Sequence, residues 1–189
     1  MTAEPGVGRP GQAALVLRVG RAQSGDRAAL EALLRDHQQP LYRHIRTITG
    51  DADLAFDVLQ SALLIVVRRL GSLRDPRWFR AWAYRIATRE AVRAARRRKR
   101  DLGLFEESSA IDEGAAETPS LDPLLVRRCA DRLAALPPAA ELTLRLHYLE
   151  EMSLVEIAEA LEIPLGTVKS RLAYGLGRLR EQLGPMVIG

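Results

Sequence analysis

Apolar residues recur at helical intervals through most of the chain, and no stretch keeps the alternation typical of half-buried strands. This pattern predicts four helices in the first half. Ser24 or Asp26 can cap the first of them, and Gly50 can end the second. The predicted helices begin near Asp26, Pro40, Asp53 and Pro76, and the last ends near Arg100.

The second half shows the same period in shorter runs. A helical segment is predicted over 124–136, and Pro137 and Pro138 interrupt it. Three more helices are then expected, over about 139–149, 153–161 and 165–183. Two stretches lack a periodic apolar face. Residues 1–24 are rich in glycine and proline and predict a mobile leader, in which residues 15–19 could form a short helix. Residues 101–123 predict a linker.

These elements predict an all-α protein of two small helical domains. An N-terminal helical bundle would occupy residues 25–100, and a C-terminal helix-turn-helix domain would occupy residues 124–189. The flexible linker between them would be acidic. It holds seven Asp or Glu residues between Asp101 and Asp122 and no basic residue.

Positive charge is concentrated just before this linker. Thirteen Arg or Lys residues lie between Arg68 and Arg100, against two acidic residues, whereas the whole chain has a net charge of only +4. A solvated helix face is the ordinary interpretation of a charge run. The density here, together with the motif described next, favours a surface that binds a polyanion.

The most specific motif is a helix, a short turn and a second helix between Ser153 and Leu172. Ser153 and Glu156 have the spacing of a capping box, and Val168 and Leu172 supply the inner face of the second helix. The start of that second helix therefore points polar side chains outward, where a recognition helix contacts base edges in the major groove. The DNA-binding residues predicted from this period are Thr167, Lys169, Ser170 and Arg171.

A basic helix in the first domain is the second candidate for contact with nucleic acid. Phe79, Trp82, Ala83 and Ile86 form an apolar stripe, for which Trp82 is assigned to the core. Arginines follow beside it at Arg85, Arg89, Arg93 and Arg96. Such a line can follow a phosphate backbone, while nearby aromatic rings stack on unpaired bases.

The sequence argues against several other classes of protein. No apolar run is long enough to span a bilayer, the start does not read as a secretory signal, and the single cysteine excludes an internal disulfide. His37 and His44 have no evident third ligand, and neither a nucleotide-binding glycine loop nor a nucleophile constellation is present. We expect a cytoplasmic protein that is not an enzyme and uses no metal or other cofactor.

Two segments together resemble the bacterial sigma factors of the extracytoplasmic-function (ECF) group, in the sigma-70 family. These are DVLQSALLIVVRRL followed by DPRWFRAWAYRIATREAVRAARRR, and LPPAAELTLRLHYLEEMSLVEIAEALEIPLGTVKSRL. The resemblance implies a subunit that joins core RNA polymerase through the beta-prime clamp helices and directs it to promoter DNA. It also implies an anti-sigma partner and no insertion into a membrane.

The resemblance assigns roles to individual residues. Asp57 and Gln60 match the positions that bind core polymerase, and the C-terminal motif matches the reader of the minus-thirty-five element. Residues 71–77 match the loop that captures a flipped base of the minus-ten element. The residues implied in minus-ten binding are Arg74, Arg77, Trp78, Arg80, Arg85, Arg89 and Arg93.

The chain departs from the family pattern at a few positions. Leu54 and Phe56 stand where acidic residues are usual, and Leu63 and Val67 replace common aromatics. The resemblance also assigns Tyr174 to the residues that read the minus-thirty-five element, at a position that is commonly basic. One alternative stays open at this point, because the C-terminal motif alone also fits a helix-turn-helix regulator that does not replace the initiation subunit.

Overall fold

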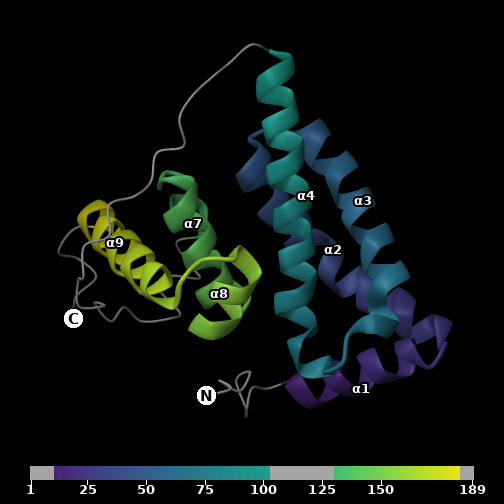
Figure 1. Cartoon of the computed structure of the whole chain (residues 1–189). Coiled ribbons are helices and arrows are strands. Elements are labelled where there is room, and N and C mark those ends of the chain that lie inside the picture. The colour runs from purple at the N-terminus through teal and green to yellow at the C-terminus, as the bar shows by residue number, and fades with distance from the viewer. Residues whose placement is uncertain (1–10, 103–129, 184–189) are drawn as a thin grey trace. The chain divides into compact units, whose positions relative to one another are not determined.

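The computed structural model describes residues 11–102 and 130–183, and within these ranges every regular element is a helix (Figure 1). The chain separates into two compact units. We call the described residues 11–102 the N-terminal unit and 130–183 the C-terminal unit. The predicted all-α fold with two helical regions is thereby confirmed. Most of the predicted linker lies outside the described residues.

The first helix, α1 (Gln12–Gln23), corrects the sequence analysis, which placed these residues in a mobile leader. Leu15, Val19 and Ala22 are buried in a core cluster that also contains Leu33 and Phe79. The glycines and prolines around this segment favoured a leader, whereas the helix that residues 15–19 could form is present and longer. Residues 1–10 of the predicted leader lie outside the described part of the chain.

Helix α2 (Arg27–Thr49) is one continuous helix, so the prediction of two helices meeting at Pro40 was wrong. The Asp26 carboxylate caps its start by accepting a hydrogen bond from the Ala29 amide at 2.9 Å. Pro40 removes the donor that the Asp36 carbonyl would accept. Because Asp36 is exposed, solvent can hydrate that carbonyl, which lowers the cost of the missing bond.

The remaining elements of the N-terminal unit follow the predicted order. Helix α3 (Ala52–Arg69) leads through the 3₁₀ turns η1 (Leu70–Ser72) and η2 (Pro76–Trp78) into α4 (Phe79–Asp101). The predicted fourth helix therefore begins as a 3₁₀ turn. Helix α4 packs against both α2 and α3, which buries more of its surface than the single predicted stripe. Its buried residues are Phe79, Ala81, Ala83, Tyr84, Ala87 and Ala91.

One buried polar contact joins α2 to α4. His44 is buried, its Nε2 lies 2.8 Å from the Thr88 hydroxyl, and its ring meets the Tyr84 ring edge-on. The Thr88 hydroxyl donates its proton to the Tyr84 carbonyl, so His44 must donate through Nε2. Burial lowers the pKa of His44 to about 3, and the ring is therefore neutral at physiological pH.

The C-terminal unit contains α6 (Ala130–Leu133), α7 (Pro138–Leu144), α8 (Leu154–Leu161) and α9 (Leu165–Leu183). Helix α7 continues as the π-helix η3 (Arg145–Leu149). The last three predicted helices are thus confirmed, and α9 has its predicted bounds. Of the segment predicted over 124–136, residues 124–129 lie outside the described residues.

Candidate nucleic-acid interface

The start of α8 is held by the predicted capping box. The backbone amide of Ser153 donates to Glu156 Oε2 at 2.8 Å, and the Glu156 amide donates to the Ser153 hydroxyl oxygen at 3.3 Å. The Ser153 hydroxyl donates in turn to Glu156 Oε2 at 2.7 Å. Glu156 is buried, so these bonds satisfy a carboxylate that would otherwise be costly inside the fold.

The turn between α8 and α9 is formed by a residue in an unfavourable conformation. Glu162 ends α8 in the left-handed region with a φ of 56°. An L residue with a Cβ is strained there, and glycine is the usual choice. Pro164 then begins the next helix, since its carbonyl accepts a hydrogen bond from the Val168 amide at 3.2 Å.

Helix α9 buries one face and presents another at its start. Val168 and Leu172 are buried, as predicted, and Lys169 and Tyr174 are exposed. The other three predicted contact residues, Thr167, Ser170 and Arg171, are half-buried. The Ser170 hydroxyl donates to the Thr167 carbonyl at 3.1 Å, which leaves its oxygen lone pairs as acceptors for a base or solvent.

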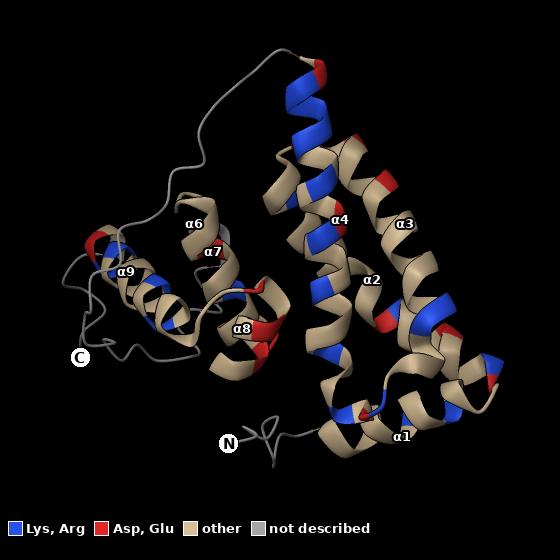
Figure 2. Cartoon of the chain, in the orientation of Figure 1, with Lys and Arg blue, Asp and Glu red and all other residues tan. Residues whose placement is uncertain are grey.

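The N-terminal unit presents a basic face along α4. In Figure 2 the Lys and Arg residues form repeated bands along this helix and gather at its C-terminal end. Arg89, Arg93 and Arg96 are exposed, and Trp82 and Ile86 pack against the core cluster as predicted. Arg98, near the end, pairs with Asp51 at 2.7 Å and so joins α4 to the residue that caps α3.

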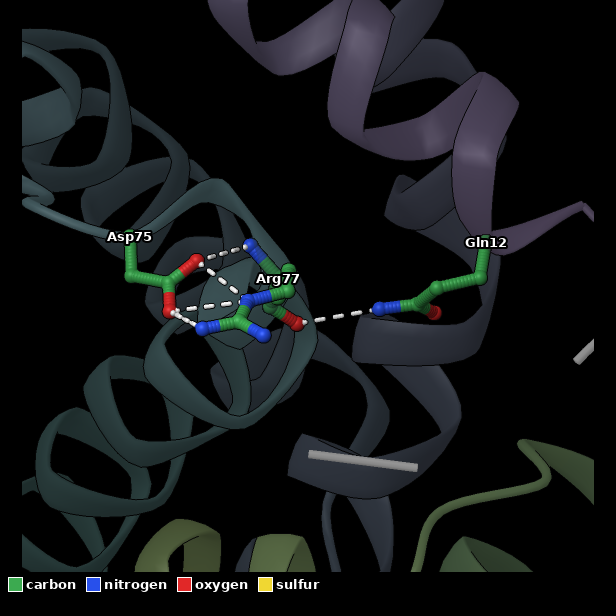
Figure 3. Close-up of polar contacts among 3 residues, drawn as sticks. All are labelled: Gln12, Asp75 and Arg77. Carbon is green, nitrogen blue, oxygen red and sulfur yellow. Dashed lines mark hydrogen bonds and ion pairs between the residues drawn. The ribbon is translucent and has the colours of Figure 1, made fainter. Parts of the chain in front are cut away.

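The loop before α4 contains an internal ion pair (Figure 3). The Asp75 carboxylate accepts from the Arg77 amide at 2.9 Å and from Arg77 Nη2 at 2.8 Å. Hydrogen bonds from Arg77 hold the pKa of Asp75 below its ordinary value. Arg77, a predicted DNA contact, therefore also shapes its own loop, and both Arg77 and Arg74 are exposed. Trp78 lies where η2 joins α4.

Helix α1 contributes two side chains that the sequence analysis did not single out. Gln23 donates from one amide nitrogen to the carbonyls of Leu70 and Leu73, at 2.9 and 2.8 Å. Gln12 donates to the Arg77 carbonyl at 3.3 Å (Figure 3). The period of Leu15, Val19 and Ala22 was the available signal, because it indicates that this segment is a packed helix.

A third surface lies on α3. Asp57 and Gln60 are exposed and share a face of the helix with the apolar side chains of Phe56, Leu64 and Val67. These three are 55%, 56% and 40% exposed, so none of them is packed in the core. A polar pair flanked by exposed apolar side chains is a composition suited to binding another protein.

The described residues offer neither a metal site nor a membrane span. These residues hold no group of three or more potential metal ligands. None of their helices combines the length and the apolar character that a membrane span requires.

Family models match both units. The model "Sigma-70 region 2" matches residues 33–101, and "Sigma-70, region 4" matches residues 132–181. Among curated proteins, the ECF RNA polymerase sigma factor SigL of Mycobacterium tuberculosis is 32% identical over 171 residues, covering 88% of this chain and 95% of SigL. The ECF sigma factor SigW of Bacillus subtilis is 29% identical over 177 residues, with the same two coverages.

The chain belongs to the ECF group of the sigma-70 family. It is an RNA polymerase sigma factor, which directs core polymerase to specific promoters and initiates transcription. Sigma factors act by binding and are not catalytic enzymes. The match to region 2 favours this function over the alternative of a regulator that uses only a C-terminal helix-turn-helix.

Solved structures agree in fold. The sigma factor RpoE from Bartonella quintana, solved in complex with the anti-sigma factor NepR, is 26% identical and has a TM-score of 0.59, covering 81% of this chain and 95% of RpoE. CnrH, solved in complex with the cytosolic domain of CnrY, has a TM-score of 0.60 at 23% identity, covering 90% of this chain and 97% of CnrH. The second likeness supports the fold alone.

Proposed function

We propose that three surfaces of this sigma factor divide the work of initiation. The exposed face of α3 with Asp57 and Gln60 binds core RNA polymerase at its beta-prime clamp helices. The loop over residues 71–77 and the basic face of α4 bind the minus-ten element, and the start of α9 binds the minus-thirty-five element. The observation that carries this proposal is that each surface presents exposed side chains while its helix is anchored in a core by another face.

The minus-ten surface is suited to an opened strand. Arg89, Arg93 and Arg96 can neutralise the phosphates of the backbone, and exposed Arg74 lies in the loop before the helix. Opening needs no catalytic residue, because a protein that binds the single strand better than the duplex shifts the equilibrium toward the open state. We therefore propose that this chain has no enzymatic activity of its own and needs no cofactor.

The minus-thirty-five surface is suited to a duplex. Exposed Lys169 and Tyr174 lie within the first three turns of α9, with half-buried Arg171 between them. Lys and Arg match the guanine acceptors of the major groove, and hydroxyl groups bond either to bases or to phosphates. Most of a helix-turn-helix contact comes from this part of the second helix.

The partners of the solved relatives extend the proposal. RpoE was solved with an anti-sigma factor, and we propose that this chain is likewise held inactive by an anti-sigma partner until a signal releases it. A sigma factor works where core polymerase and promoter DNA are found, which agrees with the cytoplasmic location expected from the sequence.

A pull-down of core polymerase tests the first surface. Immobilised wild-type protein is expected to retain core enzyme, and the double variant Asp57→Ala/Gln60→Ala is expected to retain about tenfold less, since each residue contributes polar contacts at a buried interface. Ser61→Ala, an exposed change beside Gln60, is the matched control. If the double variant retains as much core enzyme as wild type, this face of α3 is not the surface that binds core polymerase.

A further inference from the structure

We propose that α1 fixes the backbone path of the minus-ten loop, with Gln12 and Gln23 as positioning residues for base capture. The inference rests on the proposed function, because it takes the loop over residues 71–77 to be the one that holds the unpaired base. It adds a helix that lies before the region 2 match, which begins at residue 33.

Gln23 fixes the first part of the loop. One side-chain amide has two N–H donors, and here they reach two carbonyls three residues apart, those of Leu70 and Leu73. The Leu70 carbonyl also accepts from the Leu73 amide at 3.1 Å, which closes the 3₁₀ turn η1. Gln23 therefore holds the backbone at the point where it leaves that turn.

Gln12 fixes the last part of the loop. Its side-chain amide donates to the Arg77 carbonyl, while the Arg77 guanidinium and backbone amide are held by Asp75 (Figure 3). The Trp78 amide donates to the Asp75 carbonyl at 3.1 Å. The residue at the end of the loop is thus held from α1 on one side and from its own turn on the other.

The two glutamines are spaced so that one helix can hold both ends. They are eleven residues apart, which is close to three full turns, so they project from nearly the same side of α1, roughly 16 Å apart along its axis. Between them Leu15, Val19 and Ala22 anchor the helix in the core cluster that contains Leu70 and Phe79.

Helix α1 is itself fixed to α2 and to the turn between them. Arg18 pairs with Asp36, and Arg21 pairs with Asp26 at 2.6 Å. Both glutamines bond to backbone carbonyls, so they set the path of the loop and not the position of one side chain. A loop ordered before it meets DNA loses less conformational entropy on binding.

The test uses holoenzyme reconstituted with core polymerase and a fork-junction DNA. The probe is selected with wild-type holoenzyme from a pool whose unpaired non-template strand is randomised through the minus-ten region. Replacing its unpaired bases one at a time by abasic sites then identifies the captured base, whose loss should weaken wild-type binding about tenfold.

Gln23→Met keeps the length of the side chain and removes its donors. We expect it to bind the intact probe about tenfold more weakly than wild type and the abasic probe equally well, so that discrimination between the two disappears. Gln12→Met should lose less of this discrimination, because it removes only the hydrogen bond to the Arg77 carbonyl. Gln38→Met, the same change at an exposed residue of α2, should leave discrimination unchanged. Amide exchange of Leu73 in the free protein should be faster in Gln23→Met.

The results of these variants distinguish the role of α1 from the assignment of the loop to the minus-ten element. Discrimination unchanged in both Gln23→Met and Gln12→Met would overturn the inference, whatever happens to thermal stability. Arg74→Ala tests whether the loop itself is the minus-ten surface. If it weakens binding of the intact probe while the glutamine variants do not, only the inference fails; if it has no effect, the loop is not the minus-ten surface.

Discussion

Gly175 of α9 lies so close to Leu144 of α7 that a Cβ at this position would be 2.6 Å from Leu144 Cδ1. Leu144 is fully buried, so its side chain could make room only by shifting within the packed core. Glycine inside a helix ordinarily reduces stability. Here it allows α7 and α9 to approach closely, and α9 is the helix proposed to enter the major groove.

Gly175→Ala is therefore expected to destabilise the C-terminal unit, although alanine is the better helix former. Overpacking of a filled core costs about 1–3 kcal/mol, against about 1 kcal/mol gained in helix propensity. Gly177→Ala is the matched control, because nothing lies within 4 Å of a Cβ there. Thermal unfolding should show a lower midpoint for the first variant and a higher one for the second. A higher midpoint for both would contradict the close approach.

Stability should fall as the pH is lowered from 7.5 to 5. The folded-state pKa of His44, about 3, lies below the ordinary value of 6.5, so the unfolded state binds a proton that the folded state refuses. The contribution of His44 to the free energy of unfolding is fully present above pH 6.5 and is lost as the pH falls toward 3. At pH 5 the loss is about 2 kcal/mol.

Urea unfolding at the two pH values measures this loss. His37, whose pKa burial also lowers, adds a change of the same sign. His44→Gln can still donate to Thr88 and does not titrate, so about 2 kcal/mol of the difference between the two pH values should disappear. A variant that keeps the full wild-type difference would show that His44 is not the source.

Lys169→Ala is expected to weaken binding of holoenzyme to promoter DNA and to relax its preference at one position of the minus-thirty-five element. A side chain that contacts a base edge contributes about 1–3 kcal/mol of discrimination. Binding to a set of duplexes with single base-pair changes measures the effect.

Arg178→Ala supplies the comparison. It removes one positive charge from the same helix, nine residues on and half a turn around, where Arg178 is exposed and pairs with Glu181. Its effect should be small and independent of sequence. Equal, sequence-independent losses for both variants would mean that Lys169 contacts only phosphate.

Local signals in the sequence were enough to predict the C-terminal unit. Ser153 and Glu156 define the start of α8, and the period through Val168 and Leu172 defines α9. The outward position of Lys169 followed from the same period. Glu162 in the left-handed region could not be predicted, because that residue type is unusual there.

Long-range contacts account for what was missed. The stability of α1 depends on burying Leu15 and Val19 against residues far along the chain, because a helix of 12 residues is only marginally stable by itself. Gln23 reaches Leu70 across 47 positions, a pairing that no local pattern encodes. Pro40 was judged by its ordinary effect on a helix, whereas packing on both sides of it keeps α2 continuous.

Run-off transcription from a promoter library tests the central claim most directly. Purified protein is added to core polymerase, and the 5′ ends and upstream sequences of the transcripts are determined. We expect initiation at promoters that share two upstream elements at a fixed spacing, with Lys169→Ala altering only the upstream element and Arg74→Ala only the downstream one. No initiation at any promoter, from protein shown to be folded and free of inhibitor, would contradict the account.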